Sequence, residues 1–252
     1  MKVGVIAPMG TAPPVLSEFV DFLERSEKVW KVVVLATREK MVLHSAVLAS
    51  VAVRHRFPHV DVKVVELPLV DITSEEENYV FMEFAAKEVA RLRRVVDRLY
   101  LCVAGGRKEM VASMVLMAQL ANVDAAYHVV STDVKSLNVA LERIRKEIDD
   151  LAASPSPEDY YRSHLDIFEP VMFPPSSSFH VVAVPVLPYP PDALRKLVTV
   201  FAQNSVPRSG TGFDEEFLSR LRAAGFISLT RDKIIVTDGG RKFHQSVLRH
   251  LT

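Results

Sequence analysis

Two glycines followed by two basic residues form the segment of this sequence most suited to chemistry: Gly105, Gly106, Arg107 and Lys108. The segment stands between an apolar run at residues 99–104 and a longer one at 110–121. This pattern is typical of a buried strand followed by a helix that is covered on several sides. A helix start carries unpaired N–H groups and a partial positive charge, and glycine lets a ligand approach the backbone. The segment therefore predicts an anion site, with phosphate as the expected ligand.

The same four residues also fit a purely structural role. The glycines can make a tight turn between strand and helix, and the two cations can form a solvated first helical turn. The position of the segment in the fold decides between these interpretations, so the surrounding elements come next.

The first 151 residues alternate between strand-like and helix-like segments. Short apolar runs predict strands at residues 3–7, 31–36, 60–67, 99–104 and 125–130. The stretches between them show helical spacing, with Thr11 expected to cap a helix near Pro13 and two overlapping capping-box patterns in Thr73-Ser74-Glu75-Glu76-Glu77. The remaining helices are expected at residues 38–57, 110–121 and 134–151. The alternation predicts an α/β fold with a doubly wound, mostly parallel, Rossmann-like sheet.

The usual strand order 3-2-1-4-5 makes the first and fourth strands neighbours. Ligands bind at that point, beside the carboxyl ends of the strands. Gly10 and Thr11 follow the first strand, and the glycine-basic segment follows the fourth. We therefore expect two loops to converge on one crevice, which favours the anion site over the structural role.

Composition excludes several classes of protein. The sequence has 252 residues, with 31 Lys and Arg against 31 Asp and Glu, so an anion site must be local. The single cysteine, Cys102, lies in the fourth strand and is expected to be a packed thiol. The dinucleotide fingerprint and the Walker loop are both missing. We expect no cofactor and no metal, and, because no signal peptide or apolar span is evident, a cytoplasmic protein without membrane contact.

Residues 152–178 are rich in Pro and Ser and are expected to form a long loop. Loops of this length are often functional, so the segment is a candidate lid, although a plain surface excursion fits it as well. An aromatic ring, an arginine and a histidine within it would suit bases and phosphates: Tyr161, Arg162 and His164.

A smaller unit is expected at residues 203–252, after a ligand-binding domain at 1–202 that ends with a strand at 179–186 and a helix at 190–202. A polar linker at 203–212, a helix, two short strands and a final helix resemble a winged helix. Such modules bind DNA, and the expected phosphate contacts are Arg231, Lys233, Arg241 and Lys242. Because acidic residues offset these cations, a dimerisation or packing module is the favoured alternative.

Three segments together resemble a CRISPR-associated Rossmann-fold (CARF) domain. They are residues 104–110 with the apolar helix and Tyr127-His128-Val129 that follow, the turn at 10–13, and the acidic stretch at 72–78. With the winged-helix tail, nearly the full chain is similar to the archaeal standalone ring nucleases. The resemblance implies a homodimer whose two crevices form one basic pocket for cyclic tetra-adenylate. It further implies metal-independent cleavage to di-adenylates with a 2′,3′-cyclic phosphate, which switches off type III CRISPR signalling in antiviral defence.

The resemblance also implies roles for individual residues. Lys108 and Arg107 would stabilise charge on the phosphorane, and Thr11, where the family commonly has serine, would orient ribose or phosphate. The ligand would be bound by Met9, Gly10, Thr11, Ala104, Gly105, Gly106, Arg107, Lys108 and Met110. Two alternatives remain: a transcription regulator that senses a cyclic oligoadenylate and binds DNA through the winged helix, and a protein that binds the messenger without cutting it.

Overall fold

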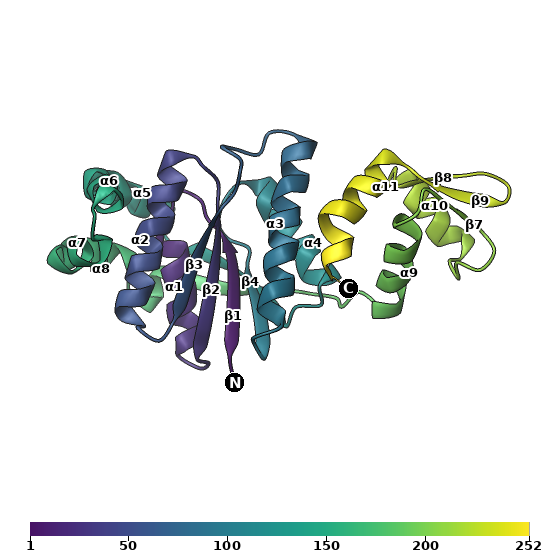
Figure 1. Ribbon diagram of the computed structural model, residues 1–252. Coiled ribbons are helices and arrows are strands. Elements are labelled where there is room, and N and C mark those ends of the chain that lie inside the picture. The colour runs from purple at the N-terminus through teal and green to yellow at the C-terminus, as the bar shows by residue number, and fades with distance from the viewer. Residues whose placement is uncertain (252) are drawn as a thin grey trace.

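A six-stranded sheet forms the core of the larger part of the protein. The computed structural model describes residues 1–251, and Figure 1 shows its ribbon. The strand order of the sheet is β3-β2-β1-β4-β5-β6, which confirms the predicted order and the α/β class. The first five strands run parallel, and β6 pairs antiparallel with β5. The strands are β1 (Val3–Pro8), β2 (Val29–Ala36), β3 (Asp61–Glu66), β4 (Arg98–Cys102), β5 (Ala125–Ser131) and β6 (Phe179–Val184).

Helices cover both faces of this sheet, and each face has its own apolar core (Figure 1). On one face, α1 (Pro14–Glu24) and α2 (Lys40–Arg56) pack on the alternate strand residues that point toward them. On the other face, α3 (Glu75–Arg93) and α4 (Lys108–Leu120) do the same. The middle strands are buried on both faces because every parallel crossover returns a helix to the sheet.

The helix starts predicted near Pro13 and at Thr73–Glu77 are both right, but the predicted cap is right only at α3 and wrong at α1. At α3, the Ser74 hydroxyl accepts a hydrogen bond from the Glu77 N–H at 3.2 Å, and the Glu77 carboxylate accepts one from the Ser74 N–H at 3.0 Å. At α1 the capping position belongs to Pro13, whose ring offers no acceptor. Thr11 therefore stays outside the helix, and its hydroxyl is exposed and free for other contacts.

The expectation of a long loop at residues 152–178 is wrong, because most of this segment is helical. The helix predicted at 134–151 is split at Ile144 into α5 (Val134–Arg143) and α6 (Arg145–Ala153). Two further short helices follow, α7 (Pro157–Ser163) and α8 (Leu165–Met172), and then a single 3₁₀ turn, η1 (Ser176–Ser178). Burial of Tyr161, Phe168 and Met172 against α1 and α2 gives these short helices the stability that their local sequence lacks.

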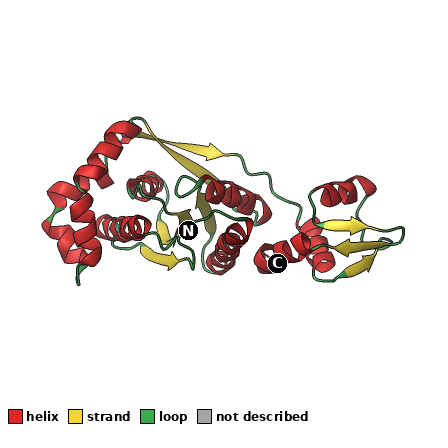
Figure 2. Ribbon diagram, turned by 90° about the horizontal axis from the view of Figure 1, so that it is seen from above, coloured by secondary structure: helices red, strands yellow, loops and turns green. Residues whose placement is uncertain are grey.

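The C-terminal part is a small α/β unit at the opposite end of the molecule from α5 to α8 (Figure 2). Its three antiparallel strands have the order β7-β9-β8. The predicted linker at 203–212 is wrong in part, because it contains a strand. The elements are α9 (Pro191–Phe201), β7 (Ser205–Pro207), α10 (Glu215–Ala223), β8 (Ile227–Leu229), β9 (Lys233–Val236), α11 (Asp238–Phe243), the π-helical turn η2 (His244–Leu248) and α12 (Arg249–Leu251).

Helix α9 packs with this unit. The ring of Phe201 lies 6.0 Å from that of Phe226, between centroids. This contact joins α9 to the small unit, and the domain division at residue 202 stays a prediction.

The C-terminal helical segment, formed by α11, η2 and α12, packs the small unit against α3. Lys242 pairs with Glu76 at 2.8 Å and Arg249 with Glu83 at 3.3 Å, while Val247 and Leu248 are fully buried in the core beside α3. Of the four cations expected to contact DNA, Lys242 is thus engaged, and Arg241 pairs with Asp238. These contacts favour the packing role for the unit, and the winged-helix assignment stays a prediction.

Nothing in residues 1–251 forms a helix that is both long and apolar enough to span a membrane.

Candidate functional site

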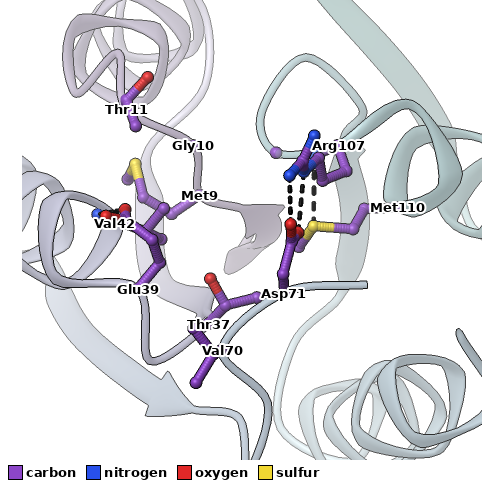
Figure 3. A pocket seen from close by; sticks show the side chains of 11 residues that line it. Met9, Gly10, Thr11, Thr37, Glu39, Val42, Val70, Asp71, Arg107 and Met110 are labelled. Carbon is purple, nitrogen blue, oxygen red and sulfur yellow. Dashed lines mark hydrogen bonds and ion pairs between the residues drawn. The ribbon is translucent and has the colours of Figure 1, made fainter. Parts of the chain in front are cut away.

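A cavity of about 360 Å³ lies at the carboxyl edge of the sheet, and we call it the edge cavity (Figure 3). The loops that follow β1, β2, β3 and β4 all contribute to it, so the predicted convergence of the first and fourth loops is confirmed. Its lining consists of Met9, Gly10, Thr11, Thr37, Glu39, Val42, Val70, Asp71, Gly106, Arg107 and Met110.

The β1 and β4 loops touch backbone to backbone, and this contact requires glycine. A Cβ atom on Gly105 would overlap the carbonyl oxygen of Pro8 and would lie 3.0 Å from its carbonyl carbon. Gly106 has φ of +81°, in the left-handed region that residues with a side chain rarely adopt. The two glycines therefore let the β1 and β4 loops approach each other closely enough to form this wall of the cavity.

The structure brings six of the nine predicted binding residues to the lining: Met9, Gly10, Thr11, Gly106, Arg107 and Met110. Gly105 is buried beneath them, and Ala104 is half-buried where β4 leads into the loop. Lys108 is the first residue of α4 and is exposed beside the cavity, outside its lining. Thr11 lies across the cavity from Arg107 (Figure 3).

Asp71, which sequence reasoning missed, holds Arg107 in place. The Arg107 Nε–H donates to Asp71 Oδ1 at 2.8 Å, and its Nη2 group donates to Oδ2 (Figure 3). The hydrogen bonds from Arg107, together with one from the Ile72 N–H, hold the pKa of Asp71 below its usual value. Asp71 follows the third strand at the same sheet edge, so the rule that located the first and fourth loops also applies to it.

Two more polar residues of the lining were missed, Thr37 and Glu39. The Glu39 carboxylate caps α2 by accepting a hydrogen bond from the Val42 N–H at 2.9 Å. The described lining thus holds two carboxylates, Glu39 and Asp71, against one guanidinium, Arg107. The groups at this edge whose charge suits an anion are Arg107, Lys108 beside it and the start of α4.

The candidate lid lies elsewhere, and that interpretation is wrong. Tyr161 is fully buried, its hydroxyl donates to Glu169 at 3.1 Å, and its ring lies 5.3 Å from that of His55 near the end of α2. The edge cavity touches the opposite end of α2, at Glu39 and Val42. The other two residues make local contacts: Arg162 pairs with Asp159, and His164 stacks on Tyr160 at 4.2 Å.

Cys102 is a packed thiol, as predicted. Burial raises its pKa to about 12, which keeps it protonated and unreactive at neutral pH. Among residues 1–251, no group of three or more His, Cys, Asp and Glu side chains is placed to hold a metal ion.

Comparison with known proteins gives one family and two distant structures. The family model described as CRISPR-associated protein NE0113 matches residues 12–209. Csm6 of Enterococcus italicus, solved with cyclic hexa-2′-fluoro-hexa-dAMP, is 14% identical with a TM-score of 0.47 over 80% of this chain and 47% of that one. Protein VC1899 from Vibrio cholerae is 10% identical with a TM-score of 0.40 over 99% of this chain and 66% of that one.

This chain thus spans about half the length of the Csm6 chain and just under two thirds of the VC1899 chain. At these scores neither likeness assigns a function. No curated protein matches the sequence.

Proposed function

Because this chain belongs to the CRISPR-associated NE0113 family, we propose that it binds cyclic tetra-adenylate at the edge cavity and cleaves the ring. The observation that carries the proposal is the contact between the β1 and β4 loops, which brings Thr11, Gly106 and Arg107 to one cavity beside the start of α4. Lys108 stands beside it. Hydroxyl, guanidinium and ammonium groups around a backbone anion site suit a ribose-phosphate backbone.

The proposed reaction needs positioning more than a reactive side chain. The ribose 2′-oxygen attacks the adjacent phosphorus, the bond from phosphorus to the 5′-oxygen breaks, and a 2′,3′-cyclic phosphate remains. The 2′-hydroxyl proton leaves to solvent, and the departing 5′-oxygen takes up a proton. Lys108 and Arg107 are assigned to the charge that develops on the phosphorane, and Thr11 to the alignment of the attacking ribose.

Arg107 keeps donors for this role while it is bound to Asp71. A guanidinium has five N–H groups, and Asp71 engages only the Nε and Nη2 atoms. The Nη1 edge is therefore available for a phosphate oxygen, and the bond to Asp71 fixes the plane of the guanidinium.

The size of the edge cavity supports a homodimer. A cavity of about 360 Å³ suits a ligand of about one nucleotide, whereas cyclic tetra-adenylate has four. Val130 on β5 and Val182 on β6 share one sheet face, the one that α4 covers, and they are 40% and 49% exposed. Leu116 of α4 is exposed as well. We assign this apolar surface to contact with a second copy, which would bring two edge cavities onto one ring.

Purified protein incubated with cyclic tetra-adenylate in excess EDTA is expected to give di-adenylates with a 2′,3′-cyclic phosphate. The Lys108→Ala variant is expected to cleave at least about tenfold more slowly, because a charge-assisted contact to phosphate contributes about 1.5–3 kcal/mol. Chromatography of the products measures both rates, and Lys146→Ala, which removes an exposed lysine on α6, serves as the matched control.

Wild-type cleavage by Lys108→Ala would remove Lys108 from the site. An intact ring that co-elutes with the protein would instead support one of the two alternatives, a sensor that binds DNA or a protein that only sequesters the messenger. A ring that neither binds nor reacts would contradict the proposed function.

Replacement of Asp71 by asparagine is expected to tighten binding of cyclic tetra-adenylate about three- to fivefold at low ionic strength. The asparagine still accepts a hydrogen bond from Arg107, but it removes a negative charge that competes with phosphate for the guanidinium. Calorimetric titration measures the change. Asp61→Asn, at the opposite edge of the sheet, removes the same charge from the ion pair with Lys31 and is the control. Weaker binding by Asp71→Asn would show that the full carboxylate is needed to position Arg107.

A further inference from the structure

A second cavity, of about 330 Å³, lies where α1, α5 and α8 meet the end of β5. We call it the Glu18 cavity, after the acidic residue that α1 contributes to its lining. Apolar side chains of α5 and α8 form part of its wall, and hydroxyl-bearing residues at the end of β5, in the β5–α5 loop and on α5 form another part: Ser131, Thr132 and Ser136. Among the described residues that line it, none is Lys, Arg or His.

Glu18 is the unusual group in this cavity. Its side chain belongs to a residue only 3% exposed, and its Oε2 atom is buried without a hydrogen-bond partner. A buried carboxyl group without a partner is costly, so burial raises the pKa of Glu18 to about 7. Near neutral pH a large fraction of the protein therefore carries Glu18 as the neutral acid, which offers one O–H donor beside one carbonyl acceptor.

The titratable groups near Glu18 do not provide a hydrogen-bond partner for its carboxyl group. The Cys102 thiol of β4 lies close enough to be affected by its charge but stays protonated. Asp133, across the cavity, is occupied at the start of α5, where it accepts a hydrogen bond from the Ser136 N–H at 3.0 Å. Helix α8 contributes only Pro170 and Val171 to the lining. The described side chains that line the cavity thus leave the Oε2 atom of Glu18 open to a molecule that enters it, either water or a ligand.

We propose that the Glu18 cavity binds an adenine base, with the neutral Glu18 carboxyl group paired to the N1 and N6 edge of the ring. The acid donates to N1 and accepts from the N6 amino group, a match in which each polar atom finds its partner. Leu137, Pro170 and Val171 supply apolar surface for the ring faces. A phosphate is excluded as the group that Glu18 faces, because the described lining of the cavity has no Lys, Arg or His to neutralise its charge.

The choice of adenine rests on the proposed function, and the base has two possible sources. It is either one adenine of a cyclic oligoadenylate whose phosphates occupy the edge cavity, or a separate adenosine. The chemistry at Glu18 is the same for both, and the ligands used in the test separate them.

The test is calorimetric titration of the full chain with adenosine and with cyclic tetra-adenylate at pH 6 and pH 8. Wild-type affinity for adenosine is expected to fall about tenfold between these values, because ionised Glu18 has no donor for N1. Glu18→Gln keeps a donor and an acceptor at every pH, so its affinity is expected to stay constant. Glu18→Leu is expected to bind at least about tenfold more weakly at pH 6, and Glu142→Gln, an exposed control on α5, to behave as wild type.

Purine riboside, which lacks the N6 amino group, is expected to bind at least about tenfold more weakly than adenosine, because the Glu18 carbonyl then has no donor. Adenosine binding that is undetectable in the wild type, or unchanged in Glu18→Leu, would overturn the proposal. Binding of spermidine in place of adenosine would also overturn it, since that result assigns a cation to Glu18. If Glu18→Leu does not fold, a pH dependence in Glu18→Gln equal to that of the wild type would overturn the proposal.

Failure of the proposed ring binding and cleavage can be distinguished from failure of the proposed adenine site at Glu18. Adenosine carries no phosphate, so Lys108→Ala is expected to leave its binding unchanged even where ring binding is lost. Parallel losses of adenosine and ring affinity in Glu18→Leu would assign the base to the ring, and loss of adenosine alone would assign it to a separate nucleoside.

Discussion

Replacement of Gly105 by alanine is expected to abolish ligand binding at the edge cavity and to destabilise the protein by about 3 kcal/mol or more. The added methyl group would overlap the Pro8 carbonyl oxygen. Pro8 cannot retreat easily, because it is in register with Leu35 of β2 and the next N–H, that of Met9, donates to the Leu35 carbonyl at 2.8 Å. The strain therefore either separates the two loops or breaks the end of β1.

Thermal unfolding followed by circular dichroism, together with titration of cyclic tetra-adenylate, measures both effects. Gly239→Ala is the matched control, since its Cβ atom would meet its nearest neighbour, the Gly225 carbonyl oxygen, at an ordinary 3.4 Å. This control is expected to unfold near the wild-type temperature and to bind as the wild type does. Normal stability and binding in Gly105→Ala would mean that the loop contact does not shape the site.

Replacement of Glu18 by glutamine is expected to raise the free energy of unfolding by about 3 kcal/mol at pH 8 and to change it little at pH 4. The folded pKa of Glu18 is raised from 4.5 to about 7. The unfolded chain therefore releases this proton at lower pH, so stability is lost as the pH rises from about 4.5 to about 7 and stays lost above that range. The size of the shift converts to about 3 kcal/mol, and an amide of the same shape does not ionise.

Urea denaturation of both proteins at the two pH values measures the difference. The lowered pKa values of Asp71 and Asp149 place their titration below this range, and every other carboxyl group is common to both proteins, so its contribution cancels in the comparison. A stability difference of equal size at pH 4 and pH 8 would contradict the assignment of a raised pKa to Glu18.

Features with a local signal were predictable from the sequence. Strands β1, β2 and β4 contain continuous apolar runs because both their faces are buried, and the α3 capping box depends only on Ser74 and Glu77. The convergence of the β1 and β4 loops followed from strand order alone, and it placed Gly10, Thr11 and Arg107 at one cavity.

Features that depend on distant partners were not predictable in the same way. Helices α7 and α8 are short and carry proline, so they form only because Tyr161 and Phe168 are buried against other elements. The bond from Arg107 to Asp71 joins two loops that are 36 residues apart in sequence. Glu18 occupies a polar position in an otherwise regular helical pattern, and nothing in that pattern shows that it is enclosed.

Helix α3 packs both against the six-stranded sheet and against η2 and α12 of the C-terminal helical segment. One continuous apolar cluster includes residues of all three. Phe81 and Val89 of α3 belong to the same cluster as Val247 and Leu248, all buried to within 1% exposure. Loss of the small unit would therefore expose apolar surface of the large one. The two units accordingly do not have independent free energies of folding, and the chain is expected to unfold cooperatively in a single transition.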